Sequence, residues 1–145
     1  MLIRQMDDLP LVELEPLRVE SRAQGHNFVD RLADDYADGS NRFNQLGEAL
    51  FGVYADGQLV AIGGLNRDPY LPDANAGRVR HLYVLTAFRR QGAGWLLMQT
   101  IIDAARPHFR LLTLRTVNPA ADAFYRKLGF RTQPTLDSTT HHMRF

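Results

Sequence analysis

Two arginines and two glycines stand immediately before a run of residues with helical spacing. Arg89 and Arg90 are followed by Gly92 and Gly94, and the apolar helical stretch then begins near Trp95. A helix N-terminus presents unpaired backbone N–H groups and the positive end of the helix dipole. Glycine lets the backbone approach a ligand closely, and arginine adds a matching charge. The segment predicts a site for a phosphate-like anion, with a plain strand-to-helix turn as the alternative.

Two widespread phosphate-binding motifs do not fit this turn. A P-loop requires Gly-Lys followed by Ser or Thr, and the single lysine, Lys127, is far from the turn. A dinucleotide-binding fingerprint requires a third glycine, and Leu97 stands at that position. The sequence therefore predicts an anion site of another kind.

A second informative segment begins 24 residues after Gly94, at Asn118. Asn followed by Pro is a good helix start in its own right. Phe124 and Leu128, four residues apart, give this helix an apolar face. Tyr125 lies about 100° around the helix from Phe124, which leaves it either a core aromatic residue or a hydroxyl available for chemistry.

Together and in this order, the two segments resemble the GNAT superfamily of N-acetyltransferases. The order of elements agrees over nearly the whole chain, and the specific motifs lie in residues 78–130. The resemblance implies acetyl-CoA as the cosubstrate, with no metal. It also implies that the turn Arg89-x-x-Gly92-x-Gly94 holds the pyrophosphate of acetyl-CoA. The residues assigned to this role are Arg89, Arg90, Gln91, Gly92, Ala93, Gly94 and Trp95.

The resemblance also implies where the rest of acetyl-CoA binds. In the family, the backbone of a splayed strand pairs with the pantetheine amides, which is a form of strand addition to an open edge. The later helix lies beside the thiol end of the cofactor. The corresponding residues are Leu82, Tyr83 and Val84 on the strand, and Asn118, Ala121 and Phe124 on the helix. Asn118 could instead serve only as a helix cap.

Tyr125 matches the family tyrosine that donates a proton to the departing thiolate. A thiol titrates near ~8.5 and a tyrosine near ~10, so a well-placed hydroxyl can protonate or stabilise the leaving sulfur. The acceptor amine needs a base. Some family members carry a Glu on the strand before the Asn, but residues 113–115 are Thr-Leu-Arg here. The remaining candidates for the base are His81, Glu48 and water.

The predicted function is an acetyl-CoA-dependent N-acetyltransferase that moves the acetyl group to a primary amine by direct transfer in a ternary complex. The amine, on a small molecule or a peptide, stays open; Asn66–Asp68, Phe28 and Arg31 are candidate contacts for it. The main alternative is a non-catalytic acyl-CoA-binding or sensing module on the same fold. An unrelated nucleotide-binding protein is a further alternative.

The pattern along the chain predicts the elements that must position these residues. A short strand at 1–6 precedes two helices, the first starting after Asp7 and Asp8 and kinked or broken at Pro16, the second capped by Asn27. Strands at 49–55 and 58–65 flank an Asp-Gly turn. After a loop at 66–77 come, in order, a strand at 78–84, a helix at 92–105, a strand at 111–117, a helix from Asn118 to Gly129 and strands at 130–133 and 139–145.

This order predicts a single α/β (α+β) domain, residues 1–145, with a mixed central sheet of about six to seven strands flanked by about four helices. Its 145 residues suit one domain. The chain contains no Cys, so it has no disulfide, thiolate nucleophile or Cys-type zinc site. Cytoplasmic localisation is the expectation, and a terminal strand in a mixed sheet could support a homodimer.

The net charge of +1 argues against general nucleic-acid binding. It hides an asymmetry of −6 over residues 1–72 and +7 over residues 73–145. Such halves would suit one anionic and one cationic ligand, although the strong preference for Arg over Lys also fits a compositional bias. No run is long enough for a membrane span. His141 and His142 are adjacent on a predicted strand and face opposite sides, so no metal site is expected.

Overall fold

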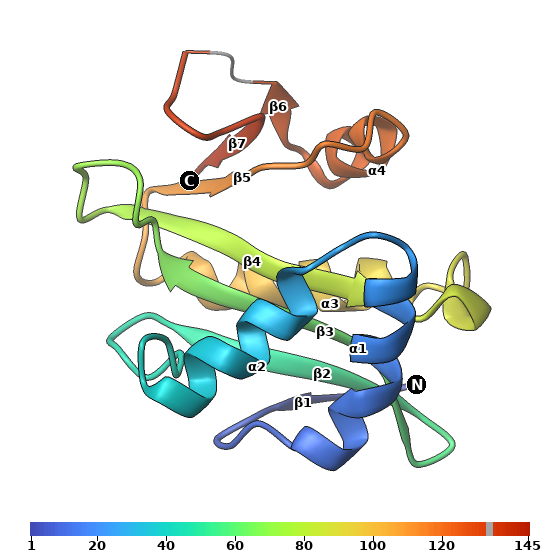
Figure 1. Ribbon diagram of the computed structural model, residues 1–145. Helices are drawn as coiled ribbons and strands as arrows, with labels where there is room; N and C mark the ends of the chain where they lie inside the picture. Colours follow the sequence, from blue (N-terminus) through green and yellow to red (C-terminus); the bar gives the residue numbers. More distant parts are fainter. Residues whose placement is uncertain (133–134) are drawn as a thin grey trace.

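The computed structural model describes residues 1–132 and 135–145 and contains a seven-stranded mixed sheet (Figure 1). The strand order is β1-β2-β3-β4-β5-β7-β6. The strands are β1 (Leu2–Gln5), β2 (Ala49–Ala55), β3 (Gln58–Arg67), β4 (Ala76–Val84), β5 (Leu111–Leu114), β6 (Arg131–Thr132) and β7 (His141–Arg144). The helices are α1 (Leu11–Ala23), α2 (Phe28–Asp38), α3 (Ala93–Ala105) and α4 (Ala121–Leu128), with a 3-10 turn at Thr86–Phe88.

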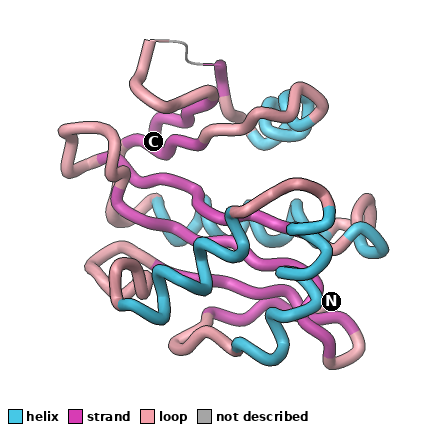
Figure 2. Tube along the Cα trace, viewed as in Figure 1, coloured by secondary structure: helices cyan, strands magenta, loops and turns pink. Residues whose placement is uncertain are grey.

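Helices cover both faces of the sheet. Figure 1 and Figure 2 show α1 and α2 on one face of β2–β4 and α3 on the other. Leu14 and Leu17 of α1 and Leu97 and Ile101 of α3 are fully buried. Burial of apolar area on both faces is the main force that holds these layers together. Helix α4 lies instead beside β5, β6 and β7, at the other side of β4 from β3 (Figure 1).

The order of elements agrees with the prediction, and the fold class is confirmed. Some boundaries differ. The loop predicted at 66–77 is shorter, because β3 and β4 stay paired as far as Arg67 and Gly77. The strand predicted at 111–117 ends at Leu114, where its pairing with β7 ends. The strand predicted at 130–133 is β6, and residue 133 lies outside the described residues.

The predicted helix starts were only partly right. Helix α1 begins after Pro10 without a side-chain cap, so Asp7 and Asp8 do not cap it, and it is not broken at Pro16. Asn27 is at the N-cap of α2, but its side chain makes no capping hydrogen bond. Helix α4 begins at Ala121, not at Asn118. Asn118 closes a turn ahead of the helix, in which its side chain accepts the Ala120 N–H and its carbonyl accepts the Ala121 N–H.

Strands β4 and β5 are paired over only three residues. The parallel register joins Ala76–Arg78 to Leu111–Thr113 and goes no further. Beyond this point β4 is paired on one side only, with β3. The register between β3 and β4 also shifts after Ile62, and His81 there has a φ of 58°. A bulge of this kind bends a strand and re-aims its side chains, which here coincides with the divergence of β4 from β5.

A buried polar network anchors the start of the divergence. Asp68 accepts hydrogen bonds from the N–H groups of Tyr70 and Leu71 and from the Thr113 hydroxyl on β5. Arg78 on β4 places Nη1 3.5 Å from Asp68 and donates through Nη2 to the Ser138 carbonyl at 2.6 Å. The side chain of Asp68 is completely buried, so its charge depends on these partners.

We expect Asp68→Ala to lower the free energy of unfolding by about 3 kcal/mol, because it leaves a buried arginine without its carboxylate. Chemical denaturation followed by circular dichroism would measure the change. Asp103→Ala is the matched control, since Asp103 is exposed on α3 and should change the value by less than about 0.5 kcal/mol. Equal stability of the two variants would show that the network does not hold β4 to β5.

Candidate active site

The unpaired edge of β4 presents backbone groups of two residues. The N–H of Leu85 bonds to the carbonyl of Val60 on β3 at 2.9 Å. Because alternate residues of a strand direct their peptide groups to opposite edges, those of Tyr83 point to β3 as well. Leu82 and Val84 therefore direct their N–H and C=O groups to the edge that β5 leaves open. An open edge of this kind can bind an extended chain that carries amides.

The turn between β4 and α3 ends in a row of free backbone donors. Gly92 is the N-cap of α3 with a φ of 89°, and Arg90 has a φ of 63°. The first N–H of the helix to find an acceptor is that of Leu96, which bonds to Gly92. In the part of the chain that the structure describes, the N–H groups of residues 90–95 have no acceptor. Such a row of donors at the positive end of a helix dipole can hold an anion, which is the role that the sequence predicts for this turn.

Arg89 is engaged in a way that the sequence did not indicate. Its Nε donates to the Val84 carbonyl at 3.0 Å, and Nη2 donates to Gln24 Oε1 at 3.2 Å. The guanidinium also stacks over the Tyr83 ring, 5.4 Å from its centroid. Arg89 thus occupies one of the two carbonyl groups on the open edge. Gln91 is similarly folded back, with Nε2 donating to the Ala87 carbonyl.

Glu20 of α1 holds this end of β4 in place and was missed in the sequence. It accepts the Tyr83 hydroxyl at 2.7 Å, the Thr86 N–H at 2.7 Å and the Thr86 hydroxyl at 2.8 Å. Burial would raise the pKa of Glu20, but these hydrogen bonds outweigh it, and the pKa lies below its usual value. Burial and the hydrogen bond to Glu20 raise the pKa of Tyr83 to about 12. The Tyr83 side chain is therefore structural.

Helix α4 approaches the same point from the other side. A Cβ on Gly94 would lie 3.6 Å from Val84 Cγ2 and 3.7 Å from the Phe124 ring. Trp95, which is 40% exposed, makes an edge contact with Phe124 at 6.2 Å between centroids. The end of β4, the start of α3 and the middle of α4 therefore meet within contact distance. The sequence placed these residues in one site, and the structure brings them together.

Tyr125, the residue after Phe124, is surrounded by aromatic rings. Its ring contacts Phe124, Phe130 and His141, with centroids 5.3, 5.9 and 5.5 Å away. The residue is 8% exposed, and burial raises its pKa to about 12. Its hydroxyl makes no hydrogen bond to any described residue. Tyr125 is thus a core aromatic residue whose protonated hydroxyl has no partner among the described residues.

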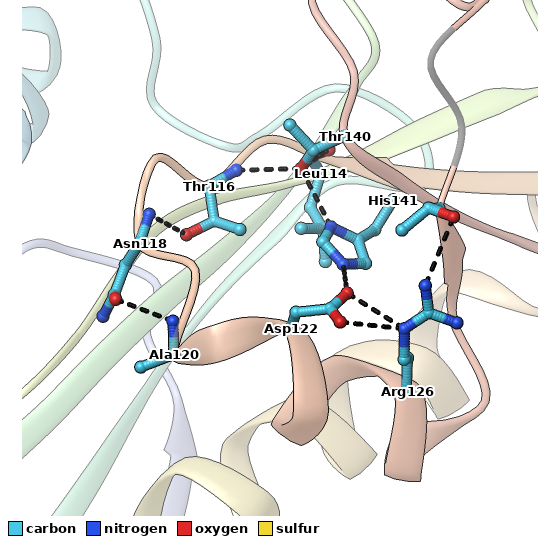
Figure 3. A network of polar contacts seen from close by, with 9 residues as sticks. Leu114, Thr116, Asn118, Ala120, Asp122, Arg126, Thr140 and His141 are labelled. Atoms are coloured by element: carbon cyan, nitrogen blue, oxygen red, sulfur yellow. Dashed lines mark hydrogen bonds and ion pairs between the residues drawn. The ribbon is translucent and has the colours of Figure 1, made fainter.

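A polar network fixes α4 against β7 (Figure 3). His141 Nε2 lies 2.7 Å from Asp122 Oδ1, and His141 Nδ1 lies 2.9 Å from the Thr140 hydroxyl. Arg126 donates to the same Asp122 carboxylate at 2.9 Å. The bond to His141 and then that to Arg126 lower the pKa of Asp122. Because His141 also packs on Tyr125, this network sets the position of the tyrosine ring.

Asn118 lies in the exposed segment that leads into α4 (Figure 3). Its N–H donates to the Thr116 hydroxyl, and its Oδ1 accepts the Ala120 N–H at 3.0 Å. The Thr116 N–H in turn donates to the Thr140 hydroxyl. The Asn118 Nδ2 group has no acceptor among the described residues, so it is available to a ligand. Ala121 follows, half-buried at the start of α4.

The structure buries one of the two side chains predicted as candidates for the base and engages the other in hydrogen bonds. Both ring nitrogens of His81 are buried without a hydrogen-bond partner in the described residues, and the ring makes an edge contact with Phe43. Burial, with a contribution from Arg80, lowers the pKa of His81 to about 4. Glu48 accepts the N–H groups of Gln45 and Arg67 as well as the Asn66 amide. Neither side chain is a free base in this conformation.

The described residues contain no cluster of three His, Cys, Asp or Glu side chains that could hold a metal. His141 and His142 have different surroundings, since His141 is buried against Asp122 while His142 Nδ1 has no partner in the described chain. None of the helices in the described residues is long and apolar enough to cross a membrane.

Comparison with known proteins identifies the family. The model of the acetyltransferase (GNAT) family matches residues 13–130. The chain belongs to the GNAT acetyltransferase family. This GNAT protein is therefore an acetyltransferase, as its sequence predicted. No curated protein gives a significant match.

Solved structures agree with this assignment. The GNAT chain is 30% identical to a protein from Exiguobacterium sp. 255-15 assigned as an acetyltransferase, with 99% of this chain and 92% of that one covered and a TM-score of 0.88. The ribosomal-protein-alanine N-acetyltransferase from Brucella melitensis is 19% identical, with both chains fully covered and a TM-score of 0.73. The PaiA N-acetyltransferase from Thermoplasma acidophilum, solved with coenzyme A, is 18% identical, with both chains fully covered and a TM-score of 0.66.

Proposed function

We propose that this protein moves the acetyl group of acetyl-CoA to a primary amine by direct transfer in a ternary complex. The observation that carries the proposal is the row of free N–H groups at residues 90–95 beside the unpaired edge of β4. An anion site next to an open strand edge suits a molecule in which a pyrophosphate is joined to a chain of amides. Acetyl-CoA is such a molecule, and acetyl transfer is the reaction of the family.

Each part of the site then has a distinct role. The N–H groups of residues 90–95 bind the pyrophosphate, with Arg90 supplying charge. Because Arg89 already occupies the Val84 carbonyl, the pantetheine amides pair with the Val84 N–H and the Leu82 peptide groups. The Asn118 Nδ2 group donates to the same arm. Ala121 and Phe124 line the side of the arm that faces α4.

Acetyl transfer exchanges a C–S bond for a C–N bond. The neutral amine attacks the thioester carbon, the sulfur leaves with the electron pair, and Tyr125 gives that sulfur its proton. A hydroxyl whose pKa is about 12 stays protonated at neutral pH and can serve as this donor. The geometry favours water over His81 or Glu48 as the acceptor of the amine proton, because the nitrogens of His81 are buried and the carboxylate of Glu48 is hydrogen-bonded.

Calorimetry with acetyl-CoA, with ATP and NAD as controls, tests the binding half of the proposal. We expect a micromolar Kd for acetyl-CoA and no heat from the controls. A panel of primary amines, followed by detection of released thiol, then tests turnover. Binding without turnover would favour the non-catalytic acyl-CoA module, and the absence of binding by folded protein would contradict the proposed site.

A further inference from the structure

A polar pocket of about 380 Å³ lies on the face of the sheet that carries α1 and α2. The end of α2, the segment 39–48, the end of β3 and Arg80 of β4 form its walls. Its charged lining residues are Asp35, Arg42, Glu48, Arg67 and Arg80. None of them belongs to the turn at residues 90–95, where the phosphates of acetyl-CoA are proposed to bind.

The floor of this pocket is a hydrogen-bonded set of polar side chains, of which Asn66 is buried and Asn41 and Glu48 are half-buried. Asn66 is 4% exposed, and its amide exchanges hydrogen bonds of 2.8 and 2.9 Å with the amide of Asn41. Asn66 also donates to Glu48 at 2.8 Å, and Glu48 accepts the Arg67 N–H at 3.0 Å. These bonds leave the floor rigid, and they satisfy the charge of Glu48 locally.

The arginines of the pocket are not equivalent. Arg42 donates to the Tyr36 carbonyl at 3.0 Å and stacks over the Tyr36 ring, so it is held away from a ligand. Arg80 is half-buried, yet its guanidinium has no hydrogen bond or ion pair in the described part of the chain. Arg67, on the rim, is exposed and its side chain likewise has no partner among the described residues. Arg80 and Arg67 are thus the two cations of the pocket lining whose guanidinium groups are left, among the described residues, to bind an anion.

An anion bound by Arg80 would not be a phosphate of acetyl-CoA. Arg80 precedes Val84 by four residues, which is about 13 Å of extended strand. The free N–H groups at residues 90–95 lie beyond Val84, at the opposite end of β4 from the pocket. Arg80 adjoins His81 and Leu82, where the proposed pantetheine arm runs toward its thiol end. The position is that of the second substrate.

We propose that the acceptor is a primary amine that also carries a carboxylate, and that Arg80 and Arg67 bind this carboxylate. The inference rests on the proposed function, since it names the substrate class of that reaction. Arginine binds carboxylates through paired, directional hydrogen bonds. Asp35 and Glu48 in the same lining disfavour the higher charge of a phosphate. With its carboxylate at Arg80, the acceptor directs its amine along β4 toward Leu82.

Paired substrates test the proposal in the steady state. Each amine is offered to the wild-type enzyme as an amino acid and as its carboxamide, with acetyl-CoA saturating. We expect the carboxylate form to have a KM at least 10-fold lower. Arg80→Gln should raise the KM of the acid about 10-fold or more, but leave the KM values of the amide and of acetyl-CoA unchanged. Arg110→Gln, at an exposed arginine away from the pocket, is the control.

Product binding provides a readout that does not depend on turnover. N-Acetylglycine and N-acetylglycinamide are titrated into wild type and Arg80→Gln, and backbone amide shifts are followed by NMR. We expect saturable shifts with N-acetylglycine that the variant weakens at least 10-fold and the amide does not produce. Equal binding of the two probes, no binding of either, or no effect of Arg80→Gln would overturn the carboxylate site. Failure of acetyl-CoA to bind would instead overturn the proposed function, so the two failures are distinguishable.

Discussion

Replacing Gly92 with Asp should weaken acetyl-CoA binding at least 100-fold. Gly92 is the N-cap of α3 at a φ of 89°, amid six N–H groups that have no acceptor in the described residues. The new carboxylate would compete for these donors and repel the pyrophosphate. Two unit charges ~4 Å apart near a protein surface repel by about 4 kcal/mol, which corresponds to roughly a thousandfold in Kd. Calorimetry with acetyl-CoA measures the loss.

Gly92→Asn separates this charge effect from backbone strain. Asn has nearly the shape of Asp, tolerates the left-handed region and carries no charge. A Cβ at position 92 has no atom within 4 Å, so neither variant clashes with the fold. We expect Gly92→Asn to change the Kd less than 10-fold and both variants to keep their helical circular dichroism. Equal losses in the two variants would mean that strain, and not anion binding, governs this position.

The conformation of the turn at residues 89–94, with free N–H groups at the start of α3, could be predicted because its signal is local. Glycine spacing, a helix that follows and a strand that precedes are all read from adjacent residues, and the structure brings Gly92, Gly94 and Phe124 to one place. The order of elements was predictable for the same reason. The resemblance to the GNAT superfamily predicts that acetyl-CoA is the molecule that binds at this turn. The match to the GNAT family model supports acetyl-CoA as the cosubstrate.

The remaining parts of the site depend on contacts between distant residues. Glu20 contacts Tyr83, 63 residues away, and nothing in the spacing around Glu20 distinguishes it from the other acids of α1. The Asp122–His141 pair joins α4 to β7 across 19 residues. Arg89 was expected to face the pyrophosphate, but its guanidinium bonds to Val84 and Gln24 instead. Side-chain direction in such cases follows from tertiary packing, which a local pattern does not contain.

The environment of His81 is a further property that a local sequence pattern does not contain. His81 was considered because imidazole has a suitable intrinsic pKa. Its position on a bulge that faces Phe43 buries both nitrogens, and burial lowers the pKa to about 4. Residue type suggests which chemistry is available, and burial decides whether the group can perform it.

Tyr125→Phe should lower kcat about 10²-fold or more and leave the KM for acetyl-CoA unchanged. General acids typically contribute ~10²–10⁴-fold, and without the hydroxyl only solvent can protonate the leaving sulfur. The substitution removes one oxygen that has no hydrogen bond to the described residues, while the ring contacts with Phe130 and His141 remain. The variant should therefore fold as well as wild type. Initial rates with saturating amine measure the change.

Two comparisons decide whether such a loss belongs to proton donation. Tyr36 is on α2, and Tyr36→Phe removes a hydroxyl that donates to the Asp7 carbonyl, so this variant should keep a kcat near the wild-type value. Because the pKa of Tyr125 is about 12, wild-type kcat should not fall through loss of the tyrosine proton between pH 6 and about pH 10. If kcat is insensitive to solvent viscosity, so that chemistry limits turnover, then equal kcat in wild type and Tyr125→Phe would assign Tyr125 to the core alone. A selective loss of kcat would instead mean that the core aromatic residue of α4 is also the acid, with the Asp122–His141 pair holding it in position.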